Sequence, residues 1–170
     1  MTLAVGSVAP DFTLAGTDGS GAVEGIHDYS LSDFTGAVVV LVFYPADASP
    51  VCTVQLATYT QDIAQFDDVG AQVLAISPQA VNQHVRFAAT NGGFAFPLLA
   101  DENHAVGEAY GVMGPIGFYR RSVFVIDAAG VIRYAHRSTA GLTFRSTDEL
   151  IDAVRTAGGE AATPQGTSAT

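Results

Sequence analysis

Hydrophobic residues gather along the chain into short continuous runs, separated by polar stretches that are rich in Gly and Pro. The run at 37–43 is wholly apolar and largely β-branched, and it ends at Tyr44-Pro45. Such a run is typical of a strand covered on both faces, and proline cannot continue a strand ladder. We therefore predict a central buried strand over 37–43. A similar run predicts a second buried strand over 72–76.

A different spacing follows the first strand. Between 51 and 66, apolar residues recur every three to five positions, which predicts a helix with one apolar face. Pro50 is suited to its first turn and Ser49 to its N-cap. The remaining predicted elements are a helix over 81–91, a strand over 96–100, a short helix over 103–110, a hairpin of strands over 122–126 and 131–136, and a final helix that opens on a capping box at 146–149 and ends near 157.

The ends of the chain differ from this central part. Residues 1–36 are rich in Gly, Asp and Thr and predict a hairpin or loop region, and residues 158–170 predict a disordered tail. No internal repeat or linker divides the rest, so we expect one domain over 1–157. A βαβ unit, a further strand, an antiparallel hairpin and a closing helix predict an α/β protein. This is the layout of a thioredoxin-like fold, with a mixed central sheet flanked by helices and an N-terminal hairpin extension.

Composition and charge narrow the class of protein and its partners. Of 170 residues, 48% are hydrophobic and 14% charged, which excludes a disordered chain. No apolar run approaches the roughly 20 residues that span a bilayer, and the N-terminus lacks the basic and apolar regions of a secretory signal. The net charge is −10, and all seven basic residues are Arg. We therefore expect a cytoplasmic protein that binds neither nucleic acid nor membranes.

Cys52 is the only cysteine, which excludes an internal disulfide, a CxxC pair and a multi-thiolate metal site. It is either an inert buried thiol or a reactive one. Its place in the first turn of a helix after a central strand favours the reactive thiol, because a helix N-terminus stabilises a thiolate and ligands bind beyond the carboxyl ends of such strands. Ser49 can place a hydroxyl beside the sulfur, and Pro45 can shield the pocket from water.

Other chemical signals are weak. The four His residues have no metal-binding spacing, and no glycine-rich stretch matches a phosphate-binding loop, so we predict no metal and no cofactor. Two competing functions stay open at this point. The first is a cysteine hydrolase, with His84 or His136 as the base for Cys52. The second is a non-catalytic thioredoxin-fold module that binds partners.

The segment 45–52 has the form Pro-x-x-x-(Thr/Ser)-x-x-Cys, which resembles the active-site signature of the peroxiredoxins. The resemblance is to the alkyl hydroperoxide reductase and thiol-specific antioxidant group, and within it to the bacterioferritin-comigratory or Q-type branch. It extends over about residues 5–155. Three further segments resemble the family in the same order, namely 9–14, 31–34 and 121–127.

The resemblance implies a role for each matching residue. Cys52 resembles the peroxidatic cysteine, and Ser49 the residue that hydrogen-bonds the peroxide and the thiolate. Pro45 resembles the shielding proline, and Arg121 the arginine that polarises the peroxide. Because neighbouring side chains on a strand point to opposite faces, only one of Arg120 and Arg121 can serve, and the spacing favours Arg121.

Two departures from the Q-type pattern shape the predicted mechanism. Gln55 stands where these proteins often carry Glu, and Ala57 stands where many carry a second, resolving cysteine. The resemblance therefore implies a one-Cys peroxidase for hydrogen peroxide or organic hydroperoxides. An external thiol would reduce it, either a small molecule or a thioredoxin- or glutaredoxin-like protein. We expect a monomer or a homodimer.

Overall fold

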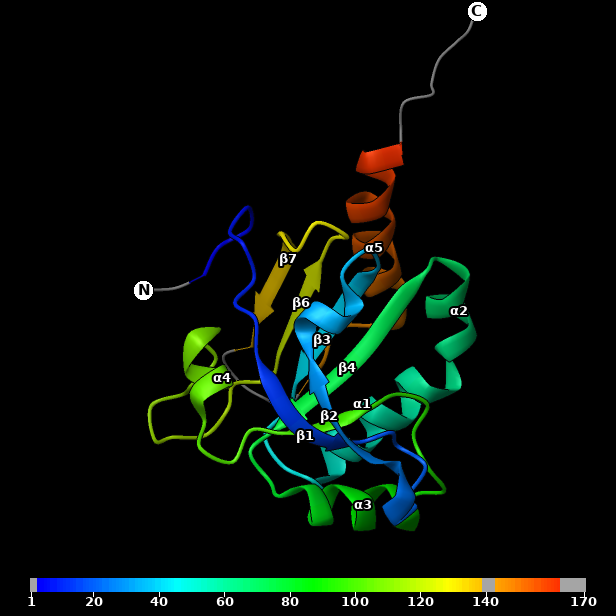
Figure 1. Cartoon of the computed structure of the whole chain (residues 1–170), viewed down its shortest axis with the longest axis vertical. Helices are drawn as coiled ribbons and strands as arrows, with labels where there is room; N and C mark the ends of the chain where they lie inside the picture. Colours follow the sequence, from blue (N-terminus) through cyan, green and yellow to red (C-terminus); the bar gives the residue numbers. More distant parts are fainter. Residues whose placement is uncertain (1–2, 139–142, 163–170) are drawn as a thin grey trace, which may run out of the picture.

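The computed structural model describes residues 3–138 and 143–162, and a seven-stranded mixed sheet runs through its centre (Figure 1). The strand order is β2-β1-β5-β4-β3-β6-β7. The strands are β1 (Thr13–Thr17), β2 (Ile26–Ser30), β3 (Val38–Phe43), β4 (Ala71–Ser77), β5 (Leu98–Ala100), β6 (Ser122–Ile126) and β7 (Ile132–Arg137), and the helices are η1 (Val23–Gly25), η2 (Leu31–Phe34), α1 (Pro50–Gln61), α2 (Ile63–Asp68), α3 (Val81–Thr90), α4 (Ala105–Ala109) and α5 (Thr147–Ala162).

Strand β3 is the centre of the sheet, as its apolar run predicts. It pairs in parallel with β4 and antiparallel with β6, so the sheet is mixed. All six of its residues are buried. Since side chains alternate along a strand, Val40 and Val42 pack into one core and Leu41 and Phe43 into the other. This mixed sheet with its flanking helices confirms the predicted thioredoxin-like fold.

The two cores are built by different elements. The core on one face contains apolar residues of α1, α2, α3 and α5. The core on the other face contains residues of η2 and α4 together with the aromatic side chains of Tyr110, Tyr119 and Phe124. The N-terminal hairpin is also confirmed: β1 and β2 pair antiparallel, and β1 joins the sheet through β5.

The predicted helix over 51–66 is two helices, because the chain leaves the helical path at Asp62. The backbone there has φ −97° and ψ 13°, and the carboxylate accepts a hydrogen bond of 2.6 Å from the Thr147 hydroxyl at the start of α5. This contact comes from the far end of the sequence. Local periodicity therefore could not reveal the break.

The last helix is longer than predicted. Helix α5 continues past Ala157 and through Gly158 to Ala162. Gly158 lies close to the Val38 side chain of β3. Only half of the predicted capping box forms: the Ser146 hydroxyl accepts from the Glu149 backbone N–H at 3.2 Å. The Glu149 carboxylate is bound by Tyr134 and Arg145 instead. The rest of the predicted tail, 163–170, lies outside the described residues.

Within the described part of the chain, no helix is both long enough and apolar enough to cross a membrane.

Candidate active site

The turn from β3 into α1 carries the predicted nucleophile. Ser49 is the N-cap residue, with extended backbone angles, and Pro50 is the first residue of the helix. Cys52 therefore lies in the first turn of α1, where its side chain is fully buried and belongs to the same core as Tyr44 and Leu56. A thiol in this position faces the positive end of the helix dipole.

Arg121 reaches Cys52 because of the pairing between β3 and β6. Ser122, the first residue of β6, pairs with Phe43, the last residue of β3, so the residue before β6 lies beside the carboxyl end of β3. Arg121 is only 3% exposed, and its Nη1 donates to the Cys52 Sγ at 3.3 Å. Arg120 is exposed. The structure thus brings Arg121, and not Arg120, to the cysteine.

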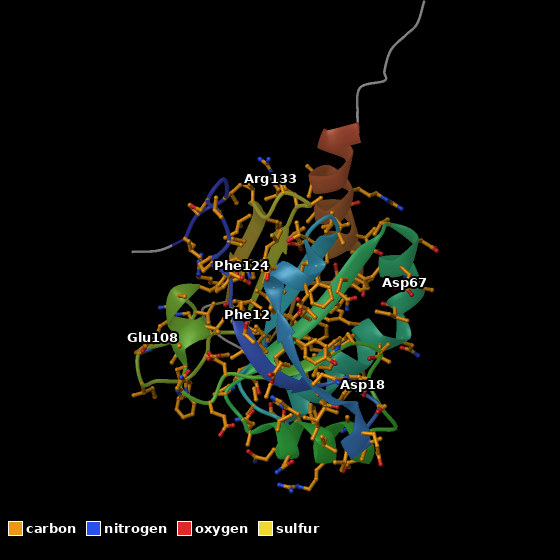
Figure 2. The ribbon with its side chains drawn as sticks, in the orientation of Figure 1. Phe12, Asp18, Asp67, Glu108, Phe124 and Arg133 are labelled. Carbon is orange, nitrogen blue, oxygen red and sulfur yellow. The ribbon has the colours of Figure 1, made fainter. Side chains whose placement is uncertain are left out.

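The burial of Arg121 is unusual for a charged residue of this protein. Figure 2 shows Phe124 inside the molecule, whereas Asp67, Glu108 and Arg133 lie around its rim. Burying a guanidinium is costly unless its N–H groups are bound. A buried arginine that donates a hydrogen bond to a sulfur atom therefore makes this place the candidate active site.

Gln55 completes the contact between helix and arginine. It lies three residues after Cys52, on the same face of α1, and is fully buried. Its Oε1 accepts from Arg121 Nη1 at 2.6 Å, so the same nitrogen contacts both the amide and the sulfur. Its Nε2 has no hydrogen-bond partner among the described residues. Gln55 orients Arg121 without adding a charge of its own.

The other two predicted residues flank the cysteine less closely. Pro45 is half-buried and follows Tyr44, whose backbone N–H still donates to Ile76 of β4 at 3.0 Å. The ladder between β3 and β4 therefore ends at Pro45. Ser49 is half-buried too, and its carbonyl accepts from both the backbone N–H and the hydroxyl of Thr53, each at 2.9 Å. Its own hydroxyl makes no capping hydrogen bond to α1.

A buried polar cluster that the sequence pattern did not predict lies beside this turn. The Asp47 carboxylate accepts from the Tyr44 hydroxyl at 2.7 Å and lies 2.8 Å from His84 Nδ1. His84 is fully buried on α3, and its Nε2 lies 3.0 Å from the Leu99 carbonyl oxygen. Burial, followed by the Asp47 charge, raises the pKa of Tyr44 well above its usual value. One signal was available, since His84 falls on the apolar face of the predicted helix with Ala88.

The histidines do not form a hydrolase site with Cys52 in the described structure. Both ring nitrogens of His84 are occupied, by Asp47 and by Leu99. His136 lies on β7 opposite Val123, and no hydrogen bond joins it to the cysteine among the described residues. Burial lowers the pKa of His136. No cluster of three or more metal-ligating side chains is present in the ranges 3–138 and 143–162.

Comparison with known proteins agrees with this geometry. The sequence matches the AhpC/TSA family over residues 5–135. It is 35% identical over 141 residues to peroxiredoxin tpx1 of Schizosaccharomyces pombe, which covers 78% of this chain and 71% of that protein. It is 36% identical over 135 residues to the chloroplastic peroxiredoxin Q of Triticum aestivum, covering 78% of this chain but 58% of the wheat protein.

Solved structures show the same fold. AhpC of Mycobacterium tuberculosis superposes with a TM-score of 0.84 at 23% identity, covering 92% of this chain and 93% of that one. AhpC of Enterococcus faecalis gives a TM-score of 0.84, covering 99% and 100%. The match over most of the sequence, together with an arginine bound to a cysteine at the start of α1, shows that this chain belongs to the AhpC/TSA family and is a peroxiredoxin, a thiol-dependent peroxidase.

Proposed function

We propose that this peroxidase works through Cys52 alone, reducing hydrogen peroxide or organic hydroperoxides in a one-Cys cycle. The observation that carries the proposal is the 3.3 Å contact between Arg121 Nη1 and the Cys52 Sγ in a buried helix turn. A guanidinium and a helix N-terminus both stabilise the thiolate, which is the nucleophilic form of cysteine.

In the first step, the Cys52 thiolate attacks the terminal oxygen of the peroxide. A sulfur–oxygen bond forms, the oxygen–oxygen bond breaks, and the leaving oxygen takes up a proton to become water or an alcohol. Sulfur loses two electrons and becomes a sulfenic acid, while the peroxide gains them. The chemistry needs no metal and no organic cofactor, because sulfur itself is oxidised.

The neighbouring residues stabilise the charge that moves during this step. Arg121 is suited to bind a peroxide oxygen beside the sulfur, because a guanidinium donates several N–H groups from a planar fork. The Ser49 hydroxyl, which is not used to cap α1, is suited to hydrogen-bond the peroxide. Pro45 offers no N–H to compete for the thiolate or to hold water. Donors placed in advance at a developing charge are a large source of rate enhancement.

The second half of the cycle needs a thiol from outside. The sequence holds one cysteine, so the sulfenic acid condenses with an external thiol, releasing water and giving a mixed disulfide. A second thiol then breaks that disulfide and restores Cys52. A similar protein, 35% identical, is a thioredoxin peroxidase of Echinococcus granulosus, which supports a thioredoxin-like reductant here. A small-molecule or glutaredoxin-type thiol fits the same chemistry.

The test is the consumption of peroxide in the presence of a dithiol reductant. We expect the protein to remove hydrogen peroxide and an alkyl hydroperoxide catalytically, with one dithiol oxidised per peroxide reduced. The ratio of the two rates would give the preferred peroxide. Consumption no faster than that of the dithiol alone would refute the proposal.

A further inference from the structure

The loop between β3 and α1 contains a strained residue. Ala48 has φ +63°, a left-handed conformation that residues with a Cβ rarely adopt. A strained backbone of this kind costs of order 1–3 kcal/mol and persists only where the surroundings hold it in place. Ala48 is itself exposed, so its own side chain does not supply that restraint. The restraint must come from its neighbours.

Asp47, the residue before Ala48, is held from several directions. Its backbone N–H donates to Gln79 Oε1 at 2.9 Å, and that oxygen also accepts from the Ser77 hydroxyl at 2.7 Å. Its carboxylate accepts from the Tyr44 hydroxyl at 2.7 Å. Both carboxylate oxygens lie against His84 Nδ1, at 2.8 and 3.0 Å. The loop is thus tied to β4 and α3 through one residue.

The hydrogen bonds define how His84 binds Asp47. A carbonyl oxygen can only accept, so Nε2, which faces Leu99 O at 3.0 Å, carries a hydrogen. Nδ1 faces both carboxyl oxygens of Asp47, at 2.8 and 3.0 Å. Both ring nitrogens of His84 are thus held, one by Asp47 and the other by Leu99. The side chains are 0% and 7% exposed, so removal of one partner leaves the other buried and uncompensated.

We propose that the Asp47–His84 pair positions Cys52: it fixes the strained loop so that the first turn of α1 places Sγ against Arg121. Neither residue contacts the sulfur by a hydrogen bond, and both nitrogens of His84 are occupied, so the pair acts through the loop. Tyr44 links the two regions, because its hydroxyl binds Asp47 and its side chain packs in the same core as Cys52. This inference rests on the proposed role of Cys52 as the nucleophile.

The test compares the rate of sulfur chemistry with the stability of the fold. Two rates are measured well below the melting temperature: single-turnover oxidation of Cys52 by hydrogen peroxide, and alkylation of Cys52 by iodoacetamide. We expect Asp47→Ala to slow both by about tenfold or more per folded molecule, since small misplacements of reacting groups carry costs of this order. The double variant Asp47→Ala/His84→Ala should be no slower than Asp47→Ala, because the two residues act as one unit.

Two further variants separate positioning from stability. Asp47→Asn should keep both rates within about threefold, because its amide can still hydrogen-bond His84 Nδ1 and still accept from the Tyr44 hydroxyl. Ile132→Ala removes a fully buried side chain from the opposite core and should lower the melting temperature without changing either rate.

Wild-type rates in folded Asp47→Ala would overturn the proposal, as would an equal slowing in Ile132→Ala. If the wild-type protein did not react with peroxide at all, the proposed function would fail, but the alkylation series would still test the positioning role.

Discussion

The two ends of strand β3 differ in what they bury. At its carboxyl end lie Cys52, Arg121 and Gln55, joined by hydrogen bonds within a closed core. At its amino end lies a cavity of about 170 Å³ that is open at the surface, where its lining residue Val8 is exposed. Its lining is mostly apolar and includes Val8, Leu31, Phe34, Val39 and Ile126.

Asp127, one of the two acidic residues that line this cavity, stabilises a turn. The Asp127 carboxylate accepts from the backbone N–H groups of Ala129 and Val131 and pairs with Arg133 at 2.7 Å. Burial alone would raise the pKa of Asp127, but the hydrogen bonds from Val131 and Arg133 outweigh it and lower the pKa. The cavity at the amino end is therefore lined by apolar side chains and a turn, whereas the carboxyl end buries polar groups.

The largest effect should come from the reactive end. Replacing Cys52 with Ser exchanges sulfur for oxygen at nearly constant size, so the fold should persist while dithiol-dependent peroxide turnover disappears. The measurement is peroxide consumption by the purified variant, with circular dichroism as the check on folding. Turnover above a few per cent of wild type in a folded variant would place the chemistry at another group.

Arg121→Lys should have the next largest effect. It keeps the positive charge but loses the planar guanidinium, whose Nη1 contacts both the sulfur and Gln55. We expect the rate constant for Cys52 oxidation to fall roughly 10²-fold, the scale found when a preorganised donor is removed. Arg120→Lys is the matched control, and its rate should stay close to wild type because Arg120 is exposed. Similar losses in the two variants would contradict the assignment of the buried arginine.

Substitutions of Gln55 should have an intermediate effect on the rate of Cys52 oxidation, and the size of the effect should depend on whether an acceptor oxygen is kept. Gln55→Leu removes the acceptor that orients Arg121 and should slow Cys52 oxidation about tenfold, equivalent to one hydrogen bond to a charged group. Gln55→Glu retains an acceptor oxygen at the same position and should slow it less. Stopped-flow oxidation measures both rates. If Cys52 were oxidised more slowly in Gln55→Glu than in Gln55→Leu, the added negative charge would matter more than the orientation of Arg121.

The smallest effect on the reaction should come from the cavity end. Ile126→Val removes one methyl group from a buried residue that lines the cavity, which should cost about 0.5–1.5 kcal/mol of unfolding free energy. Denaturant unfolding measures this cost, and peroxide kinetics measure the rate. The rate per folded molecule should equal that of wild type, and a substantial loss would mean that the two ends of β3 are coupled.

Part of this arrangement could be predicted from the sequence because it is local. The buried strand at 38–43, the helix that follows Ser49 and Pro50, and the place of Cys52 in its first turn all follow from residues within a few positions of one another. The choice of Arg121 over Arg120 also follows from the alternation of side chains near a strand.

What could not be predicted depends on contacts between distant segments. The Gln55–Arg121 hydrogen bond requires the pairing of Phe43 with Ser122, which periodicity does not specify. The Asp47–His84 pair joins two segments that meet only when α3 packs against the sheet. Nothing in the local sequence distinguishes Asp47 from an exposed loop residue.

The central claim is that one peroxide leaves one oxygen on the single thiol of this chain, and intact mass spectrometry tests it directly. The reduced protein is treated with one equivalent of hydrogen peroxide at low protein concentration, with and without a sulfenic-acid trapping reagent. The account predicts a gain of one oxygen per chain, converted to the trapped adduct when the reagent is present. A quantitative disulfide-linked dimer through Cys52 would contradict it, because the protein would then resolve its own sulfenic acid without an external thiol.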